Sequence, residues 1–511
     1  MLTDGAKHWP ERLAIVGMEC SWTYHELAQH AEAYRAMLVA AGISAGDRVV
    51  FRLPNCPEAI ALAAACAALR APFVPLDLHA PEERIALLLE DVEPALIIGE
   101  GRYAGAAARG IFNDGKLHIE GRVQRISDTG FEPLYIIFTS GSTGRPKGIM
   151  MSEAAVLAFF HGLIGFMQLP ESSRYATTSP LHFDYFWLDA GLTLGSGGTL
   201  LLLDRTLLRQ PRRLVEEIAR SAARYVSAVP TVWKMILAVA EDDLVKLANL
   251  KEIVFAGEHF PQACIKRLYE RLPGLVVTNV YGQSESIACA FQRLPSPLPQ
   301  GLQHLPVGVG HTEAELFLID AAGAEVIAPG VGGELHLKGR ILFDGYYRNS
   351  LETLRRLVPD PRGLDGVVFR SGDWCYFDEN KVFYFVGRID NQVQVAGNRV
   401  ELGEVEAVLL AHSAVNNVAV IAVEKEAGAT LHAFVVSSEG LAENELEEQL
   451  RTHSAEWLPH YMRPNRFHLM KSLPLTSNGK TDALVLRSYL NLTDGELIRH
   501  CSGPRSSILS I

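Results

Sequence analysis

Hydrophobic and polar positions follow two different periods in the first eighty residues. After Thr23, a residue type that often caps helices, apolar side chains return every three or four positions, which predicts an amphipathic helix. The apolar members of this pattern are Leu27, Ala31, Tyr34 and Leu38. Short apolar runs at 47–53 and 72–76 predict strands, and the alanine-rich run at 57–69 predicts a helix between them.

The alternation of strands and helices continues along the chain. Further apolar runs predict strands at 135–138, 199–203, 225–229, 252–256 and 276–280. Such alternation is typical of α/β layers with largely parallel sheets, which bind ligands beyond the carboxyl ends of their strands. After about residue 310 the pattern changes to short strands and turns, which predicts a β-rich subdomain. We expect an α/β fold with a large N-terminal region at 1–389 and a small α+β domain at 390–511.

Composition and charge exclude several classes of protein. The 511 residues are 48% hydrophobic and 21% charged, a balance typical of a soluble protein with more than one domain. A net charge of −12 argues against a nucleic-acid-binding surface. The longest apolar run, 59–69, has 11 residues, whereas a membrane span needs about 20, and the charged N-terminus suggests no signal segment. The seven cysteines form no CxxC pair, so we expect reduced thiols in a cytoplasmic protein.

A loop rich in glycine and hydroxyl residues follows the predicted strand at 135–138. Its sequence from Thr139 to Gly148 is TSGSTGRPKG. Glycines let backbone N–H groups approach an anion, hydroxyl groups donate to phosphate oxygens, and Lys147 adds positive charge. The loop is not a P-loop, because Pro146 rather than glycine precedes the lysine. Taken alone, the segment fits either an anion site or a flexible surface turn.

This loop resembles the phosphate loop of the adenylate-forming superfamily, which includes acyl-CoA synthetases, luciferases and the adenylation domains of nonribosomal peptide synthetases. Four more segments resemble motifs of the superfamily in the same order: an adenine and magnesium segment at 279–285, a ribose-binding element at 370–374, a hinge segment at 387–404 and a catalytic-lysine loop at 473–480. The resemblance runs from about residue 13 to residue 486. It implies a core that binds ATP and an acid, followed by a mobile C-terminal lid.

The resemblance also implies an ATP site with Mg²⁺ and a role for each matching residue. The nucleotide-binding set would be Thr139, Ser140, Gly141, Ser142, Thr143, Gly144, Lys147, Gly257, Asn279, Val280, Tyr281, Gly282, Ser284, Asp373, Arg388 and Lys480, with Thr139, Glu285 and Lys480 acting in catalysis. Glu285 would hold Mg²⁺, a hard cation that favours oxygen ligands. Asp373 would accept both ribose hydroxyls, Arg388 would reach the ribose or the phosphates, and Lys480 would bridge the substrate carboxylate and the α-phosphate. The ordinary alternatives are a solvated glutamate, a turn aspartate, a surface ion pair and an exposed lysine.

Two aspartates favour an amino acid as the acid that is activated. Asp184 matches an aspartate that pairs with the α-ammonium group in amino-acid-activating members, and a carboxylate in an apolar pocket requires a cation. The alternative for Asp184 is a helix N-cap. Asp390 matches the hinge aspartate of the same members, where many acyl-CoA synthetases carry lysine. Asp189 is expected to be a structural carboxylate, and His182 fits either the pocket mouth or packing.

The expected pocket is neutral apart from Asp184 and Lys480. The residues that match the family's pocket positions are Asp184, Tyr185, Leu188, Ser227, Val254, Ala256, Val280, Ala288 and Cys289. No charge is available for a charged side chain, and Tyr185 narrows the space. A small neutral amino acid is therefore expected, with proline first because the run at 255–261 is similar to that of prolyl-carrier adenylation enzymes. Alanine is second, because D-alanine-activating relatives share part of the same run. One methylene in a pocket changes selectivity by only about 1–3 kcal/mol, so the side chain itself is weakly determined.

The chain departs from the family pattern at the segment that reads Gln394 and Ala396, where basic residues are common. Gly397, which would let a pantetheine arm pass, is present. After residue 486 no Gly-Gly-His-Ser-like attachment motif follows, so we expect a separate phosphopantetheinylated carrier protein, as in nonribosomal peptide and antibiotic biosynthesis. Two rival functions remain: a CoA ligase acting on a carboxylic acid, and a degenerate homologue that only binds nucleotide.

Overall fold

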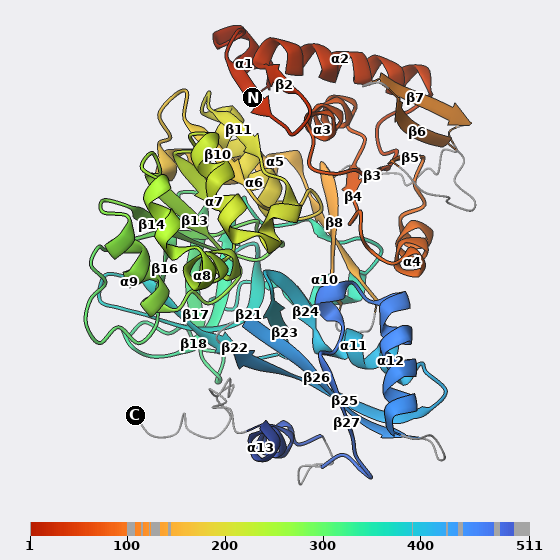
Figure 1. Cartoon of the computed structure of the whole chain (residues 1–511), viewed down its shortest axis with the longest axis vertical. Coiled ribbons are helices and arrows are strands. Elements are labelled where there is room, and N and C mark those ends of the chain that lie inside the picture. The colour runs from red at the N-terminus through yellow and green to blue at the C-terminus, as the bar shows by residue number, and fades with distance from the viewer. Residues whose placement is uncertain are drawn as a thin grey trace. The chain divides into compact units, whose positions relative to one another are not determined.

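The computed structural model describes residues 2–99, 108–113, 116–121, 123, 133–141, 145–390, 392–425, 428–437, 443–474 and 481–494. Figure 1 traces the elements from red at the N-terminus to blue at the C-terminus. The chain divides into two compact units. The first comprises Met1–Leu78, Asp91–Phe138 and Gly148–Val386, and the second comprises His79–Glu90, Thr139–Lys147 and Gly387–Ile511.

The first long helix of the first unit begins where the sequence predicts. Helix α2 (Tyr24–Ala40) has Thr23 as its N-cap. The Thr23 hydroxyl accepts a hydrogen bond from Glu26 N at 3.2 Å, and the Glu26 carboxylate accepts one from Thr23 N at 2.7 Å, which completes a capping box. Leu27 and Leu38 are buried on one face of the helix, as the periodicity predicts.

One sheet of the described residues has eight strands in the order β19-β9-β8-β4-β3-β5-β6-β7. In chain order they are β3 (Val49–Arg52), β4 (Phe73–Pro75), β5 (Leu96–Gly99), β6 (Ala108–Asn113), β7 (Lys116–Gly121), β8 (Tyr135–Thr139), β9 (Lys147–Met151) and β19 (Gly345–Tyr346). Strand β3 is buried along its whole length and pairs in parallel with β4 and β5. Helices α3 (Pro57–Leu69) and α4 (Glu82–Val92) join these parallel strands.

A second sheet of the described residues has fourteen strands. They are β1 (Leu13–Val16), β2 (Ser21–Thr23), β10 (Arg174–Thr177), β11 (Thr199–Leu202), β12 (Tyr225–Ser227), β13 (Glu252–Phe255), β14 (Val276–Tyr281), β15 (Ala290–Leu294), β16 (Pro306–Gly310), β17 (Ala314–Ile319), β18 (Gly333–Gly339), β20 (Leu357–Pro359), β21 (Val367–Phe377) and β22 (Phe383–Arg388). Strands β11-β10-β12-β13-β14 are parallel, and those beyond β14 toward β17 are antiparallel. The parallel part therefore directs the ends of β12, β13 and β14 to one edge.

Helices connect and cover the parallel strands of this sheet. They are α5 (Glu153–Met167), α6 (Asp184–Gly195), α7 (Pro211–Arg220), α8 (Pro230–Val239) and α9 (Gln262–Arg271), while α1 (Leu2–His8) precedes the sheet in the chain and α10 (Ser350–Arg356) lies in the β-rich part. Figure 1 shows α7, α8 and α9 beside the strands β13 and β14. Trp233 of α8 is fully buried in a core that includes Ile253 of β13 and Val277 of β14.

The second unit contains its own sheets and core. Its elements after residue 390 are β23 (Gln392–Val395), β24 (Asn398–Glu401), α11 (Leu402–Leu410), β25 (Val415–Lys425), β26 (Gly428–Ser437), α12 (Glu443–Trp457), β27 (Arg466–Leu469) and α13 (Ala483–Asp494). Strands β23 and β24 form a hairpin whose turn places Ala396 and Gly397 at φ of 48° and 78°, the signature of a type I′ turn. Leu409 of α11, Leu431 of β26 and Leu450 of α12 share one buried core.

The predicted fold class is confirmed. The predicted strands at 135–138, 199–203, 225–229, 252–256 and 276–280 match β8, β11, β12, β13 and β14 within one or two residues. The C-terminal α+β region is present, and it groups with two earlier segments that the sequence did not associate with it. The exact domain boundary at residue 390 stays a prediction. In the part of the chain that the structure describes, no helix is long and apolar enough to cross a membrane.

Candidate functional site

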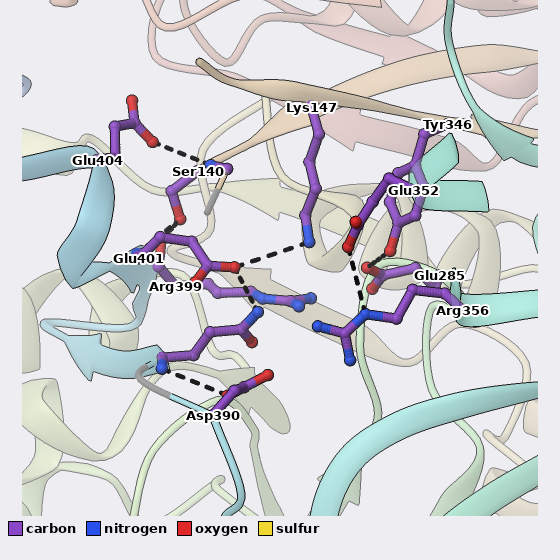
Figure 2. Close-up of polar contacts among 12 residues, drawn as sticks. Ser140, Lys147, Glu285, Tyr346, Glu352, Arg356, Asp390, Arg399, Glu401 and Glu404 are labelled. Atoms are coloured by element: carbon purple, nitrogen blue, oxygen red, sulfur yellow. Dashed lines mark hydrogen bonds and ion pairs between the residues drawn. The ribbon is translucent and has the colours of Figure 1, made fainter. Parts of the chain in front are cut away.

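The loop after β8 belongs to the second unit, where the hairpin strand β24 holds it. The Ser140 hydroxyl donates to the carbonyl oxygen of Arg399 at 2.8 Å and accepts from the backbone N–H of Glu401 at 3.1 Å (Figure 2). Thr139, the last residue of β8, is buried, and its hydroxyl has no hydrogen-bond partner among the described residues. A buried hydroxyl without a partner is costly, so this position suits a ligand oxygen.

The carboxylates of Glu404 and Glu401 contact the groups of the same loop that could bind an anion (Figure 2). The backbone N–H of Gly141 donates to Glu404 Oε2 at 3.0 Å, and Lys147 Nζ lies 3.8 Å from Glu401 Oε1. Arg84, on α4, pairs with the other oxygen of Glu404 at 2.5 Å. Burial raises the pKa of Glu401, and the charge of Lys147 partly opposes this effect. In this structure, the N–H of Gly141 and the ammonium group of Lys147, which the sequence predicts to bind phosphate, therefore contact carboxylate oxygens of the same unit.

In the first unit, the predicted adenine segment contacts the predicted ribose carboxylate. Tyr281 Oη and Gln283 Nε2 both donate to Asp373 Oδ2, and Asp373 N donates to the Ser371 hydroxyl at 3.0 Å. Asp373 is 3% exposed within β21. Asn279 Nδ2 donates to Pro306 O at 2.9 Å. Segments about ninety residues apart are thus joined around one buried carboxylate.

Close backbone packing shapes the same segment. A Cβ atom added to Gly282 would lie 2.3 Å from Ala288 Cα, so only glycine fits at this position. Gly257, the second residue after β13, has a φ of 78°. Cys289 N donates to Tyr281 O at 2.8 Å, so the chain that follows the turn at 282–288 is hydrogen-bonded to the last residue of β14. Ser284 is half-buried beside the turn.

Glu285, the predicted magnesium ligand, is completely buried. Its Oε1 accepts a hydrogen bond from Tyr346 Oη at 2.7 Å (Figure 2). Among the described residues, no group of three or more His, Cys, Asp or Glu side chains could hold a metal ion. A single buried carboxylate nevertheless fits Mg²⁺, which usually takes one or two protein carboxylates and completes its shell with phosphate oxygens and water.

The predicted amino-acid pocket residues cluster at the carboxyl ends of parallel strands in the first unit. Ser227 ends β12, Val254 lies opposite it in β13, and Val280 lies in the next strand, β14. Leu188 of α6, Ala288 and Cys289 are also buried, while Tyr185 and Ala256 are half-buried. The sheet thus brings together positions spread over about a hundred residues.

Asp184 is the first residue of α6 and is 9% exposed. The N-cap of this helix is Phe183, not Asp184, and the Asp184 carboxylate accepts the Tyr185 backbone N–H at 2.8 Å. The helix N-cap alternative is therefore wrong, although the carboxylate still lies at the positive end of the helix. His182 Nδ1 lies 3.9 Å from Asp77 Oδ1, a contact at the edge of pairing distance.

Asp189, five residues further along α6, is fully buried. Its two carboxylate oxygens accept hydrogen bonds from Tyr175 Oη at 3.1 Å and from Thr177 Oγ1 at 2.6 Å. Burial raises the pKa of Asp189 to about 7, and the hydrogen bond from Thr177 is the largest effect that opposes burial. These contacts support the expected structural role.

The predicted hinge of the second unit contains a bidentate ion pair. Arg388 Nε and Nη2 donate to the two oxygens of Asp390 at 2.8 and 2.7 Å. The alternative considered for Arg388, an ion pair, is thus present in this structure, and its partner is the predicted hinge residue. Gly397 lies in the turn of the hairpin β23-β24.

The structure describes most, but not all, of the site residues that the sequence predicts, and it adds four that the sequence did not predict. Four predicted residues, Ser142, Thr143, Gly144 and Lys480, lie outside the described residues. The sequence missed Tyr346, Arg84, Glu401 and Glu404. Glu401 and Glu404 lie inside the recognised hinge segment at 387–404, so their acidic character next to a basic loop was a usable signal. Nothing in the local sequence of Tyr346 or Arg84 indicated a partner.

Comparison with known proteins identifies the family. The model of the AMP-binding enzyme family matches residues 2–347, and the model of the AMP-binding enzyme C-terminal domain matches residues 404–480. The chain belongs to the AMP-binding enzyme family. The resemblance to the adenylate-forming superfamily, inferred from the order of five motifs, is therefore confirmed.

Individual AMP-binding relatives differ in how much of their length the chain covers. The dimodular nonribosomal peptide synthase of Bacillus subtilis is 31% identical over 93% of this chain, which spans 20% of that protein. The L-proline–[L-prolyl-carrier protein] ligase of Streptomyces coelicolor is 30% identical over 94% of each chain. Among solved structures, IdnL1 is 36% identical with a TM-score of 0.83, covering 93% of this chain and 97% of its own.

The raised pKa of Asp189 predicts a pH-dependent stability. In the folded enzyme this group keeps its proton up to about pH 7, whereas an unfolded aspartate loses it near about pH 4. Because the folded state binds more protons between these values, its stability falls as pH rises from about 4 to about 7, by at most about 1.4 kcal/mol per pH unit. The melting temperature should therefore drop between pH 5 and pH 7.5, and Asp189→Asn should reduce this drop. Asp204→Asn, at the half-buried cap of a short 3₁₀ helix, is the matched control. Equal slopes in all three proteins would contradict the prediction.

Proposed function

We propose that the protein activates a small neutral amino acid with ATP and transfers it to the phosphopantetheine thiol of a separate carrier protein. The observation that carries the proposal is the contact of Tyr281 and Gln283 with the buried carboxylate of Asp373. It joins the two segments to which the family resemblance assigns adenine and ribose. An acceptor carboxylate beside a half-buried tyrosine ring suits a nucleoside, which offers two hydroxyl donors and an aromatic face.

The charge requirements of adenylation explain the remaining assignments. The amino-acid carboxylate attacks the α-phosphate in line and releases pyrophosphate, so positive charge and donors must lie where negative charge builds up. Thr139, Ser284 and Lys147 would supply donors to the phosphates, and Lys480 would contact both the carboxylate and the α-phosphate. Glu285 would hold Mg²⁺, which neutralises phosphate charge when bound.

The pocket supports an amino acid rather than a simple carboxylic acid. Asp184 is more than nine-tenths buried at the start of α6, where an ammonium group would compensate its charge. No other charged residue belongs to the pocket set within unit 1. The identity to a prolyl-carrier protein ligase over nearly the full length of both chains supports proline as the first candidate, with alanine second.

Transfer to a carrier protein is supported by the same relative, whose name specifies a carrier protein as acceptor. Gly397 would let the pantetheine arm pass close to the backbone of the hairpin turn. The rival function is a CoA ligase. Supplying CoA and carrier protein separately, after adenylate formation, distinguishes the two, because a carrier-specific enzyme forms no thioester with CoA alone.

The primary test of adenylation is ATP–pyrophosphate exchange, screened across amino acids, aryl acids and fatty acids. We expect exchange with proline or alanine, and loss of exchange in Lys480→Ala by about two to three decades, because one preorganised donor to a charged transition state is removed. Lys471→Ala, a neighbouring lysine outside the motif, is the matched control. A wild-type enzyme without exchange for any acid would reject the proposal and support the degenerate homologue, and exchange within about tenfold of wild type in Lys480→Ala would reject the role of Lys480.

Asp184 provides the test of substrate class. Asp184→Asn keeps an oxygen that can accept the Tyr185 N–H but removes the charge that would meet the ammonium group. Stranding a buried cation costs about 3–5 kcal/mol, so amino-acid activation should fall by about a hundredfold or more. The des-amino acid should gain relative to the amino acid. Asp189→Asn, on the same helix, should leave this preference unchanged; a screen in which a fatty acid, an aryl acid or lysine is the best substrate would contradict the assignment.

The two half-reactions can be separated at Asp390. If this residue absorbs most of a lid rotation, proline, which fixes φ near about −65° and restricts Ile389, should trap one orientation. Asp390→Pro should then keep near-normal pyrophosphate exchange while carrier loading falls by about a hundredfold. Since the substitution also removes the ion pair with Arg388, Asp390→Asn is the control that loses the charge but not the backbone freedom. Wild-type carrier loading in Asp390→Pro would exclude a single-residue hinge.

A further inference from the structure

The hydrogen bond between Tyr346 and Glu285 joins two buried groups. Tyr346 Oη donates to Glu285 Oε1 at 2.7 Å, and the two residues are 2% and 0% exposed. A buried carboxylate depends on such donors, because it has lost its hydration. A donor on one oxygen also fixes the rotamer of the carboxylate and therefore the direction of its other oxygen.

The segment from Phe343 to Tyr346 holds Glu285 at both its backbone and its side chain. Phe343 N donates to Glu285 O at 2.9 Å, while Tyr346 supplies the hydroxyl to the carboxylate. The rings of Phe343 and Tyr346 pack edge to face, with their centroids 4.8 Å apart. Tyr346 N donates to Thr353 Oγ1 at 2.9 Å, which anchors the backbone of the tyrosine as well as its side chain.

The backbone of β19, the strand that contains Tyr346, is held in place by close packing and hydrogen bonds. Gly345 has a φ of 125°, and a Cβ atom there would lie 2.9 Å from the Thr353 side chain, so glycine is required for this approach. Tyr346 pairs with Ile149 of β9, and the next residue, Tyr347, donates its N–H to Gly148 O at 2.7 Å. The tyrosine is thus placed by a short strand and not by a loose loop.

We propose that Tyr346 is the positioning residue for the magnesium-binding carboxylate of Glu285. The proposal rests on the proposed adenylation reaction, in which Glu285 holds Mg²⁺. Groups that orient a metal ligand through a hydrogen bond typically change metal affinity by about ten- to a hundredfold when they are removed. Tyr346 would therefore act on the metal requirement of the enzyme while never touching the nucleotide.

The test compares Tyr346→Phe with Tyr347→Phe in the full chain. Both substitutions remove one phenolic hydroxyl from neighbouring positions, but Tyr347 Oη donates to Val92 O at 3.4 Å and not to Glu285. For Tyr346→Phe we expect the Mg²⁺ concentration that gives half-maximal pyrophosphate exchange to rise by about tenfold, with the KM for the amino acid little changed. Mn²⁺ binding to the enzyme–ATP complex, followed by electron paramagnetic resonance, should weaken by the same factor. Tyr347→Phe should match the wild type in both measurements.

The outcomes separate this proposal from the proposed function. If the wild-type enzyme shows no Mg²⁺-dependent exchange with any acid, adenylation itself fails. If the wild type is active and Tyr346→Phe has a wild-type Mg²⁺ response and wild-type Mn²⁺ affinity, the positioning role is overturned. A Tyr346→Phe enzyme whose activity is lowered equally at all Mg²⁺ concentrations, with unchanged Mn²⁺ affinity, would show that the hydroxyl acts only in packing and would also overturn it.

Discussion

The burial of carboxylates is the constraint on which the chemistry of this protein depends. Asp184, Asp189, Glu285 and Asp373 lie in the first unit and are each at least nine-tenths buried. A carboxylate that has left water must remain protonated, accept hydrogen bonds or meet a cation. Asp189 illustrates the first two solutions, because two hydroxyl groups bond to it and its pKa rises to about 7. The proposed function gives the other three carboxylates ligand partners: an ammonium group, Mg²⁺ and the ribose hydroxyls.

The loop after β8 in the second unit, for which we propose phosphate binding, presents the reverse situation, because it supplies hydrogen-bond donors and a positive charge. Its donors are anion-binding groups, and they contact carboxylates of the same unit: Gly141 N–H contacts Glu404, and Lys147 lies near Glu401. Phosphate oxygens directed to these donors would have to replace carboxylate oxygens, which are also negatively charged acceptors. The proximity of Arg145 O to the Cβ position of Gly141, 1.9 Å, explains why this donor can be presented only by glycine. The glycine, hydroxyl and lysine residues of the loop indicated the donors in the sequence. The structure adds that Gly141 and Lys147 contact Glu404 and Glu401.

Much of the fold could be predicted from the sequence because its signals are local. The capping box of Thr23 and Glu26, the apolar periodicity of α2 and the short runs that became β12, β13 and β14 all operate within a few residues. The register that sets Ser227 beside Val254 needs the whole sheet. The family motifs supplied the candidate site residues, but not their mutual contacts.

The contacts that sequence reasoning missed connect positions far apart in the chain. Arg84 and Glu404 are separated by 320 positions, and Glu285 and Tyr346 by 61. No period or local motif links such residues, since only the tertiary fold brings them together. The N-cap alternative for Asp184 failed for a smaller reason. Helix α6 begins at Asp184 itself, so Phe183 takes the cap position and the Asp184 carboxylate accepts the N–H of Tyr185 in the first turn.

The two ion pairs of the second unit differ in how easily a ligand could replace them. The Arg388–Asp390 pair is 17% and 27% exposed, so both charges keep part of their hydration, and a phosphate or ribose oxygen could replace Asp390 at Arg388 more easily than at a fully buried pair. The Arg84–Glu404 pair is 11% and 1% exposed, and separating a buried pair costs about 3–5 kcal/mol. Glu404 also accepts the Gly141 N–H, so the two interactions are coupled. We therefore expect the Arg388–Asp390 pair to break more easily than the Arg84–Glu404 pair. If a polyphosphate binds the loop after β8 as proposed, its negative charge would have to compensate for the lost contacts of Glu404.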